Sequence, residues 1–279
     1  MTATWAKLPA MRRRRIPPAV VLLLLTLAPQ VRGAETARQI LDRRKALDDT
    51  ARKWTDRQER LRMTIRDGRG GERRREMMLY ERRLPGDARQ TIVFFEAPAE
   101  VKGTGFLSHT QQGKPAEQWL YLPELQRVRQ ITPRSRTESF VGSDLSYQDL
   151  DIIQEMGAWS EEDAASSLRG EESVNGTPTW VVELRPRRDD VGYRRIVLWL
   201  GRDDLVPRRL EFYGDGEAPT KRIVQSDVAL VGAIPVPRRI EVETPAKGTT
   251  TRIDSSDAAF DPGLEPDLFT QRALERGQR

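Results

Sequence analysis

From residue 57 onward the chain is a series of short segments in which apolar and polar residues alternate, and this feature restricts the fold most. In residues 61–66 leucine, methionine and isoleucine alternate with charged or polar residues, and an Asp-Gly pair follows at 67–68. Asn175 and Gly176 form another strong hairpin signal. We count about ten to twelve such segments, without the intervening helices of a parallel sheet. The sequence therefore predicts an α+β fold with a strongly curved antiparallel sheet, because so long a meander must curl, split or close.

Helices are expected in few places. Apolar residues at helical spacing predict one over residues 35–54. Shorter helices are expected near 147–153 and 161–167, within the irregular stretch 132–170, and over 265–274. Irregular stretches of that length in compact domains are usually functional. These helices are too few to cover ten or more strands, so we expect the curved sheet to hold a cavity.

The first 33 residues have the pattern of a secretory signal peptide. A basic region ending at 12–15 precedes an apolar run at 19–28, and small residues favour cleavage after Gly33, leaving a domain of residues 34–279. An uncleaved anchor is the alternative, although the run is shorter than the roughly 20 residues that span a bilayer. The leader holds six basic residues and no acidic one, so its removal changes the net charge from +5 to −1. A nearly neutral protein gives no reason to expect nucleic-acid binding.

Catalytic and metal-binding patterns are weak throughout the sequence. His109 is the single histidine, and no serine lies in a Gly-x-Ser-x-Gly elbow, so a triad with Ser143 and Asp144 lacks its usual context. One histidine and no cysteine exclude the usual zinc ligand sets. The absence of cysteine also excludes disulfides and a lipid-modified cysteine. We therefore expect a protein without catalytic residues, metal or cofactor.

Three motifs are more distinctive than the strands around them. They are KGTGFL at 102–107, WLYLPELQRVRQI at 119–131 and SFVGSDLSYQDL at 139–150. Together they resemble the LolA-like outer membrane lipoprotein-sorting protein family of Gram-negative bacteria. Two positions depart from the family pattern. A basic residue is expected at Gln130, and an aromatic residue is common at Leu145. The resemblance extends over residues 35–275, and its specific part is these motifs.

The resemblance implies a half-barrel whose concave face shelters acyl chains under a helical lid. It implies a periplasmic, non-enzymatic carrier or chaperone that moves lipoproteins or lipids toward the outer membrane. Its partners would be the acylated cargo and an inner-membrane transporter of the RND/MMPL or ABC type, with transient membrane contact only. One alternative is a regulatory module resembling RseB that binds an inner-membrane signalling protein. Another is an enzyme that uses the carboxylates of residues 144–151.

Two groups of residues are candidates for the site. Aromatic and leucine side chains on or beside the expected strands are candidates for the cavity wall, with plain core packing as the alternative. They are Phe94, Phe106, Trp119, Tyr121, Phe140, Leu145, Trp180 and Leu198. Residues of the long irregular stretch and its flanks are candidates for a lid that meets a headgroup or a partner, with a solvated rim and a helix-capping turn as alternatives. They are Arg127, Arg129, Gly142, Ser143, Asp144, Tyr147 and Asp149, with Arg134 and Arg136 nearby.

Overall fold

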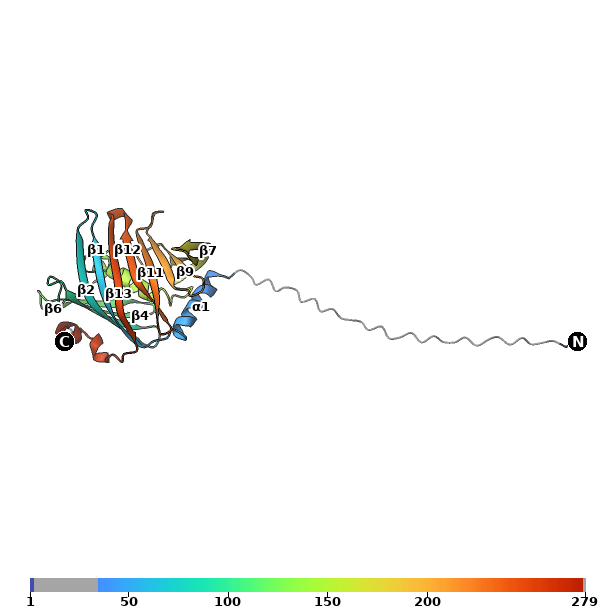
Figure 1. Ribbon diagram of the computed structural model, residues 1–279, viewed down its shortest axis with the longest axis horizontal. Helices are drawn as coiled ribbons and strands as arrows, with labels where there is room; N and C mark the ends of the chain where they lie inside the picture. Colours follow the sequence, from blue (N-terminus) through green and yellow to red (C-terminus); the bar gives the residue numbers. More distant parts are fainter. Residues whose placement is uncertain (3–34, 278–279) are drawn as a thin grey trace. The chain divides into compact units, whose positions relative to one another are not determined.

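Thirteen antiparallel strands form one continuous sheet in the computed structural model, which describes residues 1–2 and 35–277. The predicted signal peptide lies outside these residues. One folded unit begins at Glu35, and its sheet is strongly curved, as predicted (Figure 1). The strands are β1 (Asp56–Arg66), β2 (Glu72–Arg83), β3 (Arg89–Ala97), β4 (Gly105–Gln111), β5 (Lys114–Leu122), β6 (Arg127–Gln130), β7 (Ala164–Val174), β8 (Thr177–Pro186), β9 (Arg195–Gly201), β10 (Pro207–Tyr213), β11 (Lys221–Val231), β12 (Ile234–Thr244) and β13 (Thr249–Phe260).

The strand order explains where the irregular stretch must run. Each strand pairs with its neighbours in sequence, except that β1 pairs with β13 and leaves β6 and β7 as the two edges of an open sheet. β6 and β7 are consecutive in the chain, so residues 131–163 must pass from one edge to the other. We call this segment the β6–β7 connection. It contains the short 3-10 helices η1 (Pro133–Thr137) and η2 (Phe140–Gly142) and the helix α2 (Tyr147–Glu155).

Apolar and polar residues that alternate along a strand lie on opposite faces of the sheet. On β1, Met63 and Ile65 are buried in the main core on the concave side. Arg62 and Arg66 face outward and form cross-strand ion pairs with Glu76 (3.3 Å) and Glu72 (3.0 Å) of β2. Exposed pairs of this kind contribute at most about 1 kcal/mol each. Burial of the inner row therefore contributes more to the fold than the charges outside.

Three helices lie within the described part of the chain. α1 (Ala37–Asp49) begins with a capping box between Thr36 and Gln39 and ends five residues before the predicted limit. The predicted helix near 147–153 is confirmed as α2, whose capping box pairs Ser146 with Asp149. The predicted helix near 161–167 is wrong. The Ser160 hydroxyl bonds to the side chain and backbone of the next residues in a turn, and β7 begins at Ala164.

The C-terminal segment covers part of the outer face. It consists of η4 (Pro266–Phe269) and α3 (Gln271–Arg276), and α3 contacts β4, β5 and β6 (Figure 1). Phe269 and Leu274 are buried there against Ile92 and Leu107. A Cβ atom on Gly105 would lie 2.7 Å from the Leu274 Cδ1 atom, so the second glycine of the KGTGFL motif permits this close approach. None of the helices in the described residues has the length and apolar character that crossing a membrane requires.

Candidate functional site

A cavity of about 390 Å³ lies on the concave side of the sheet. Its walls come from β1 to β4 and β10 to β13, and α1, α2 and the residue pair Phe140 and Leu145 of the β6–β7 connection contribute further lining. Most of the lining is apolar and includes Leu79, Ile223 and Ile240. The cavity therefore has the character of a site for an apolar ligand, and the β6–β7 connection forms part of its cover.

Five of the eight predicted wall residues belong to this concave side. Phe106, Phe140 and Leu145 line the cavity directly. The Phe106 and Phe140 rings pack edge to face with centroids 5.2 Å apart. Leu198 and Trp180 pack in the same core cluster but do not line the cavity. The apolar underside of the β6–β7 connection is thus continuous with the core of the sheet.

The other three predicted wall residues lie on the opposite face. Phe94, Trp119 and Tyr121 form a separate cluster with Phe269 and Leu274 under the C-terminal segment. Their placement follows from the two-residue period of a strand. On β3, Val93 and Phe95 belong to the concave core, so Phe94 must point outward. These three positions in the cavity wall were wrongly predicted.

His109 also lies on the outer face. Its Nε2 atom is 3.0 Å from the Phe269 carbonyl oxygen, and its ring packs edge to face on Trp119 with centroids 5.2 Å apart. Burial lowers the pKa of His109. The imidazole therefore helps to hold the C-terminal segment and faces away from Ser143 and Asp144, which lie on the concave side.

The GSD segment, residues 142–144, fixes the β6–β7 connection to the hairpin of β12 and β13. Asp144 accepts hydrogen bonds from the hydroxyl groups of Thr244 and Thr251, each at 2.7 Å, and from that of Thr249. Gly142 has φ +79°, a backbone conformation that favours glycine. The capping alternative named the wrong residues, because Ser146 caps α2 and neither Ser143 nor Asp144 does. The segment is a docking element of the β6–β7 connection.

Asp149 connects α2 with the second half of the sheet. It is fully buried and accepts hydrogen bonds from the Tyr193 hydroxyl at 2.6 Å and from the Ser146 backbone amide at 2.6 Å. It also forms an ion pair with Lys221 of β11, which is itself buried. Burial and the Asp149 carboxylate raise the pKa of Tyr193, so the phenol remains a donor. This group of residues holds the first turn of α2 against β11.

Asp151 connects α2 with the first half of the sheet. Gln118 of β5 donates to it at 2.7 Å, and Arg136 of η1 forms an ion pair with it. Burial raises the pKa of Asp151 to about 7, against the opposing effect of Arg136. Tyr147, at the start of α2, packs against the Phe106 ring at 5.8 Å. α2 is therefore attached to both halves of the sheet.

The predicted basic residues do not form one group. Arg127 and Arg129 are exposed on the edge strand β6, and Arg129 Nη2 lies 3.4 Å from the Ser135 hydroxyl oxygen. Arg134 is exposed on η1, whereas Arg136 turns inward to Asp151. Arg127, Arg129 and Arg134 are therefore exposed outside the cavity lining, and Arg136 belongs to the contacts of α2.

A different group of arginines lines the cavity and was missed in the sequence. Arg44, Arg52, Arg57, Arg83 and Arg89 all contribute to its lining. One signal was available. Arg44 lies three and four residues after Leu41 and Ile40 and three before Leu47, on the apolar stripe of the predicted helix. An arginine on the buried stripe of a helix needs a polar or charged partner. The predicted strands gave no such partner for Arg44, so this position could have been recognised as unusual.

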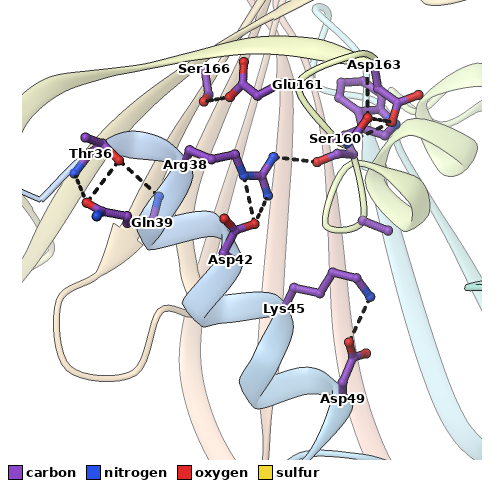
Figure 2. Close-up of polar contacts among 12 residues, drawn as sticks. Thr36, Arg38, Gln39, Asp42, Lys45, Asp49, Ser160, Glu161, Asp163 and Ser166 are labelled. Atoms are coloured by element: carbon purple, nitrogen blue, oxygen red, sulfur yellow. Dashed lines mark hydrogen bonds and ion pairs between the residues drawn. The ribbon is translucent and has the colours of Figure 1, made fainter.

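α1 is attached to the far end of the β6–β7 connection. Arg38 Nη1 donates to the Trp159 carbonyl oxygen at 2.8 Å, and the same guanidinium group forms an ion pair with Asp42 at 2.6 Å (Figure 2). Lys45 and Asp49 form a second ion pair about two turns further along the helix, at 2.9 Å. α1 therefore closes one side of the cavity as a fixed wall. Across residues 1–2 and 35–277, no three side chains of His, Asp or Glu are grouped so that they would hold a metal ion.

Comparison with known proteins agrees with this architecture. A family model described as an uncharacterized protein matches residues 87–276. A domain from Vibrio parahaemolyticus described as an outer membrane lipoprotein-sorting protein has a similar structure, with 28% identity, a TM-score of 0.77, and coverage of 85% of this chain and 97% of that one. A DUF1329 family protein from Desulfovibrio piger is similar at 27% identity and a TM-score of 0.78, covering 85% of this chain and 98% of that one.

A more distant structure shares the fold. A LolA superfamily protein from Nitrosomonas europaea has 19% identity and a TM-score of 0.64, and the match covers 86% of this chain and 100% of that one. No curated protein matches the sequence. This match shows that the chain shares its fold with a LolA superfamily protein.

Proposed function

Because this chain belongs to the LolA-like outer membrane lipoprotein-sorting protein family, we propose that it is a periplasmic protein that binds the acyl chains of lipids or lipoproteins without chemical change. It would act as a carrier or chaperone that moves its cargo toward the outer membrane. Loading would come from an inner-membrane transporter, and its contact with membranes would be transient.

The observation that carries the proposal is the apolar cavity of about 390 Å³ on the concave face. Its size falls within the usual range of ligand sites, about 300 to 1,000 Å³. Burial of each methylene group would stabilise a complex by about 0.8 kcal/mol. A chain of ten carbons would therefore gain about 8 kcal/mol, which is comparable with the roughly 4 to 15 kcal/mol that association costs.

The β6–β7 connection would serve as the lid of this cavity. Its underside contributes Phe140, Leu145 and Ile153 to the cavity wall. Polar contacts of Asp144, Asp149 and Asp151 hold this connection in place. Opening would break these few contacts while the sheet stays intact. Loading and release would then depend on how a membrane or a partner protein competes for those contacts.

The contacts of the carboxylates in residues 144–151 favour a structural role for these groups over a catalytic one. Asp144 is bonded by three threonine hydroxyls, Asp149 by Lys221 and Tyr193, and Asp151 by Arg136 and Gln118. Each is engaged in holding the β6–β7 connection, so we propose no covalent step.

Native mass spectrometry of the protein purified from the periplasm, with lipid extraction in parallel, tests the proposal. We expect an acylated molecule at close to unit stoichiometry. A mass without ligand, together with no uptake of fluorescent acyl probes, would contradict a carrier. A stable complex with an inner-membrane signalling protein in place of lipid would instead favour the regulatory function.

A further inference from the structure

Five arginine side chains gather at one end of the cavity. Arg57 is the second residue of β1, Arg83 ends β2 and Arg89 begins β3, and these strand ends adjoin in the sheet. Arg44 and Arg52 reach the same place from α1 and the residues after it. Three carboxylates accompany them, those of Asp48, Glu59 and Glu81. The group therefore has a formal excess of two positive charges.

The carboxylates are shared unequally among these arginines. Glu81 is almost completely buried and accepts from Arg57 at 2.8 Å and from Arg89 at 3.2 Å. Glu59 lies 3.5 Å from Arg57 as well. Arg57 and Arg89 are thus neutralised by carboxylates within the group.

Arg44 and Arg83 are neutralised less completely. Arg44 lies 3.9 Å from Asp48, beyond hydrogen-bond distance, and its Nη1 atom is buried without a partner in the described residues. Arg83 donates from Nη1 to the Asp48 carbonyl oxygen at 3.3 Å and stacks 3.9 Å above the Trp54 ring. Its Nε atom is likewise buried, and residues 35–277 provide it no acceptor. Two guanidinium groups that line the cavity therefore each have one buried nitrogen without an acceptor.

The electrostatic surroundings point the same way. Burial and repulsion from Arg89 lower the pKa of Arg83 to about 10. Burial also lowers the pKa of Arg44, with Arg89 and Arg52 adding to the effect. Both groups are cations at neutral pH, and a buried cation that is only partly neutralised reduces stability. An anion entering this end of the cavity would relieve that cost.

We infer that Arg44 and Arg83 bind the negatively charged headgroup, a carboxylate or a phosphate, of an amphiphile whose acyl chain fills the cavity. This site rests on the proposed function and specifies its ligand class. Planar guanidinium groups match the oxygens of both headgroups. Leu79, four residues before Arg83 on β2, already belongs to the apolar wall. One end of the cavity thus suits an anion and the rest suits a hydrocarbon chain.

Calorimetric titration with three ligands of equal chain length tests the site. The ligands are decanoate, decyl phosphate and the neutral decanol. We expect the protein to bind at least one of the anions about tenfold more tightly than decanol, as two charge-assisted hydrogen bonds allow. The stronger of the two anions identifies whether the site prefers a carboxylate or a phosphate.

Variants then assign the preference to the two arginines. The double variant Arg44→Gln/Arg83→Gln is expected to lose the preference for anions and to bind decanol as before, which also shows that it is folded. Arg62→Gln/Arg74→Gln is the matched control, because these arginines are 63% and 73% exposed outside the cavity. It should leave the affinity for all three ligands unchanged.

The outcomes separate this site from the cavity itself. Equal affinity of the unmodified protein for decanoate, decyl phosphate and decanol would overturn the anion site and leave the acyl cavity in place. An anion preference that survives in Arg44→Gln/Arg83→Gln would overturn the assignment to these residues. Failure of all three ligands to bind would overturn the proposed function, and the anion site with it.

Discussion

Single buried residues hold the β6–β7 connection, and the pair of Asp149 and Lys221 shows how. Replacement of Lys221 by methionine would leave the Asp149 carboxylate buried without a cation, and Asp149 is fully buried. We expect Lys221→Met to lower the free energy of unfolding by about 3 to 5 kcal/mol, measured by urea titration. Arg62→Met is the control, since its ion pair with Glu76 is exposed and should contribute less than about 1 kcal/mol. Equal small losses in both variants would contradict the assigned role.

Asp151 makes the attachment of α2 dependent on pH. Burial raises its pKa to about 7 in the folded protein, above the ordinary value of 3.8. The folded state therefore binds this proton more tightly than the unfolded chain. Its contribution to stability is complete below pH 4 and is lost as the pH rises through 7. The net stability of the folded protein should therefore fall over that range, although the bonds from Arg136 and Gln118 favour the ionised carboxylate.

Comparison with Asp151→Asn isolates this contribution, because asparagine resembles the protonated acid. We expect the free energy of unfolding of the unmodified protein, minus that of the variant, to fall between pH 4 and 7. The slope should be at most about 1.4 kcal/mol per pH unit. Urea titrations at pH 4, 5, 6 and 7 measure it. A difference that rises with pH would show that the bond from Arg136 keeps the carboxylate ionised instead.

The sequence indicated which residues are candidates for the site better than it indicated the face of the sheet on which each side chain lies. Phe106, Phe140 and Leu145 line the cavity, and their binding of lipid stays a prediction. Phe94 was misplaced because β3 is apolar on both faces, with the main core on one side and the C-terminal segment on the other. Alternation shows that two faces exist but does not show which one is concave. That choice depends on the curvature of the whole sheet.

Among the elements, the β6–β7 connection is the one whose stability bears most on function. Asp144 docks it on the β12–β13 hairpin through three threonine hydroxyls. We expect Asp144→Ala to lower the free energy of unfolding by about 1 to 3 kcal/mol, because those hydroxyls lose their acceptor. The larger effect should be local, with amide hydrogen exchange of residues 139–150 accelerated at least tenfold.

Hydrogen exchange followed by mass spectrometry measures this local effect. Asp257→Ala is the matched control, because Asp257 is a carboxylate on β13 that is 76% exposed. It should leave exchange of residues 139–150 unchanged. Faster exchange spread evenly over the strands in Asp144→Ala would mean that Asp144 stabilises the whole sheet, and a lid that opens by itself would then be the wrong description.

Local chemistry explains which elements were predictable. α2 was predicted near residues 147–153, but its capping box of Ser146 and Asp149 was not recognised in the sequence. The helix expected near 161–167 failed because Ser160 forms a turn and residues 164–174 pair with β8 along the sheet edge. Composition alone does not distinguish a polar edge strand from a polar helix. A partner strand, which lies later in the sequence, decides between them.

At the scale of the whole folded unit, the pairing of β1 with β13 determines the architecture. It joins the beginning and the end of the meander, so the open edges fall at β6 and β7. The sequence predicted a meander that curls, but this pairing links residues nearly 200 positions apart, such as Leu61 and Ser255. No local pattern encodes such a pairing.

The cavity makes stability depend on ligand. A ligand that binds only the folded protein should stabilise it by about 2.7 kcal/mol when its concentration is a hundred times its Kd. Ile240→Trp would fill part of the cavity from β12, which Ile240 lines. We expect this variant to lose most of the stabilisation, because the added ring occupies the volume that an acyl chain needs. Thermal unfolding with and without the best-bound decyl ligand measures the difference.

Val224→Trp is the control for the added ring. Ile223 and Gln225 line the cavity, so Val224 between them on β11 faces outward. Val224→Trp should keep the full thermal shift, whatever it does to stability without ligand. Loss of the shift in both variants would mean that tryptophan acts through the sheet and not by filling the cavity. A full shift in Ile240→Trp would place the acyl chain elsewhere, because the concave cavity cannot hold both groups.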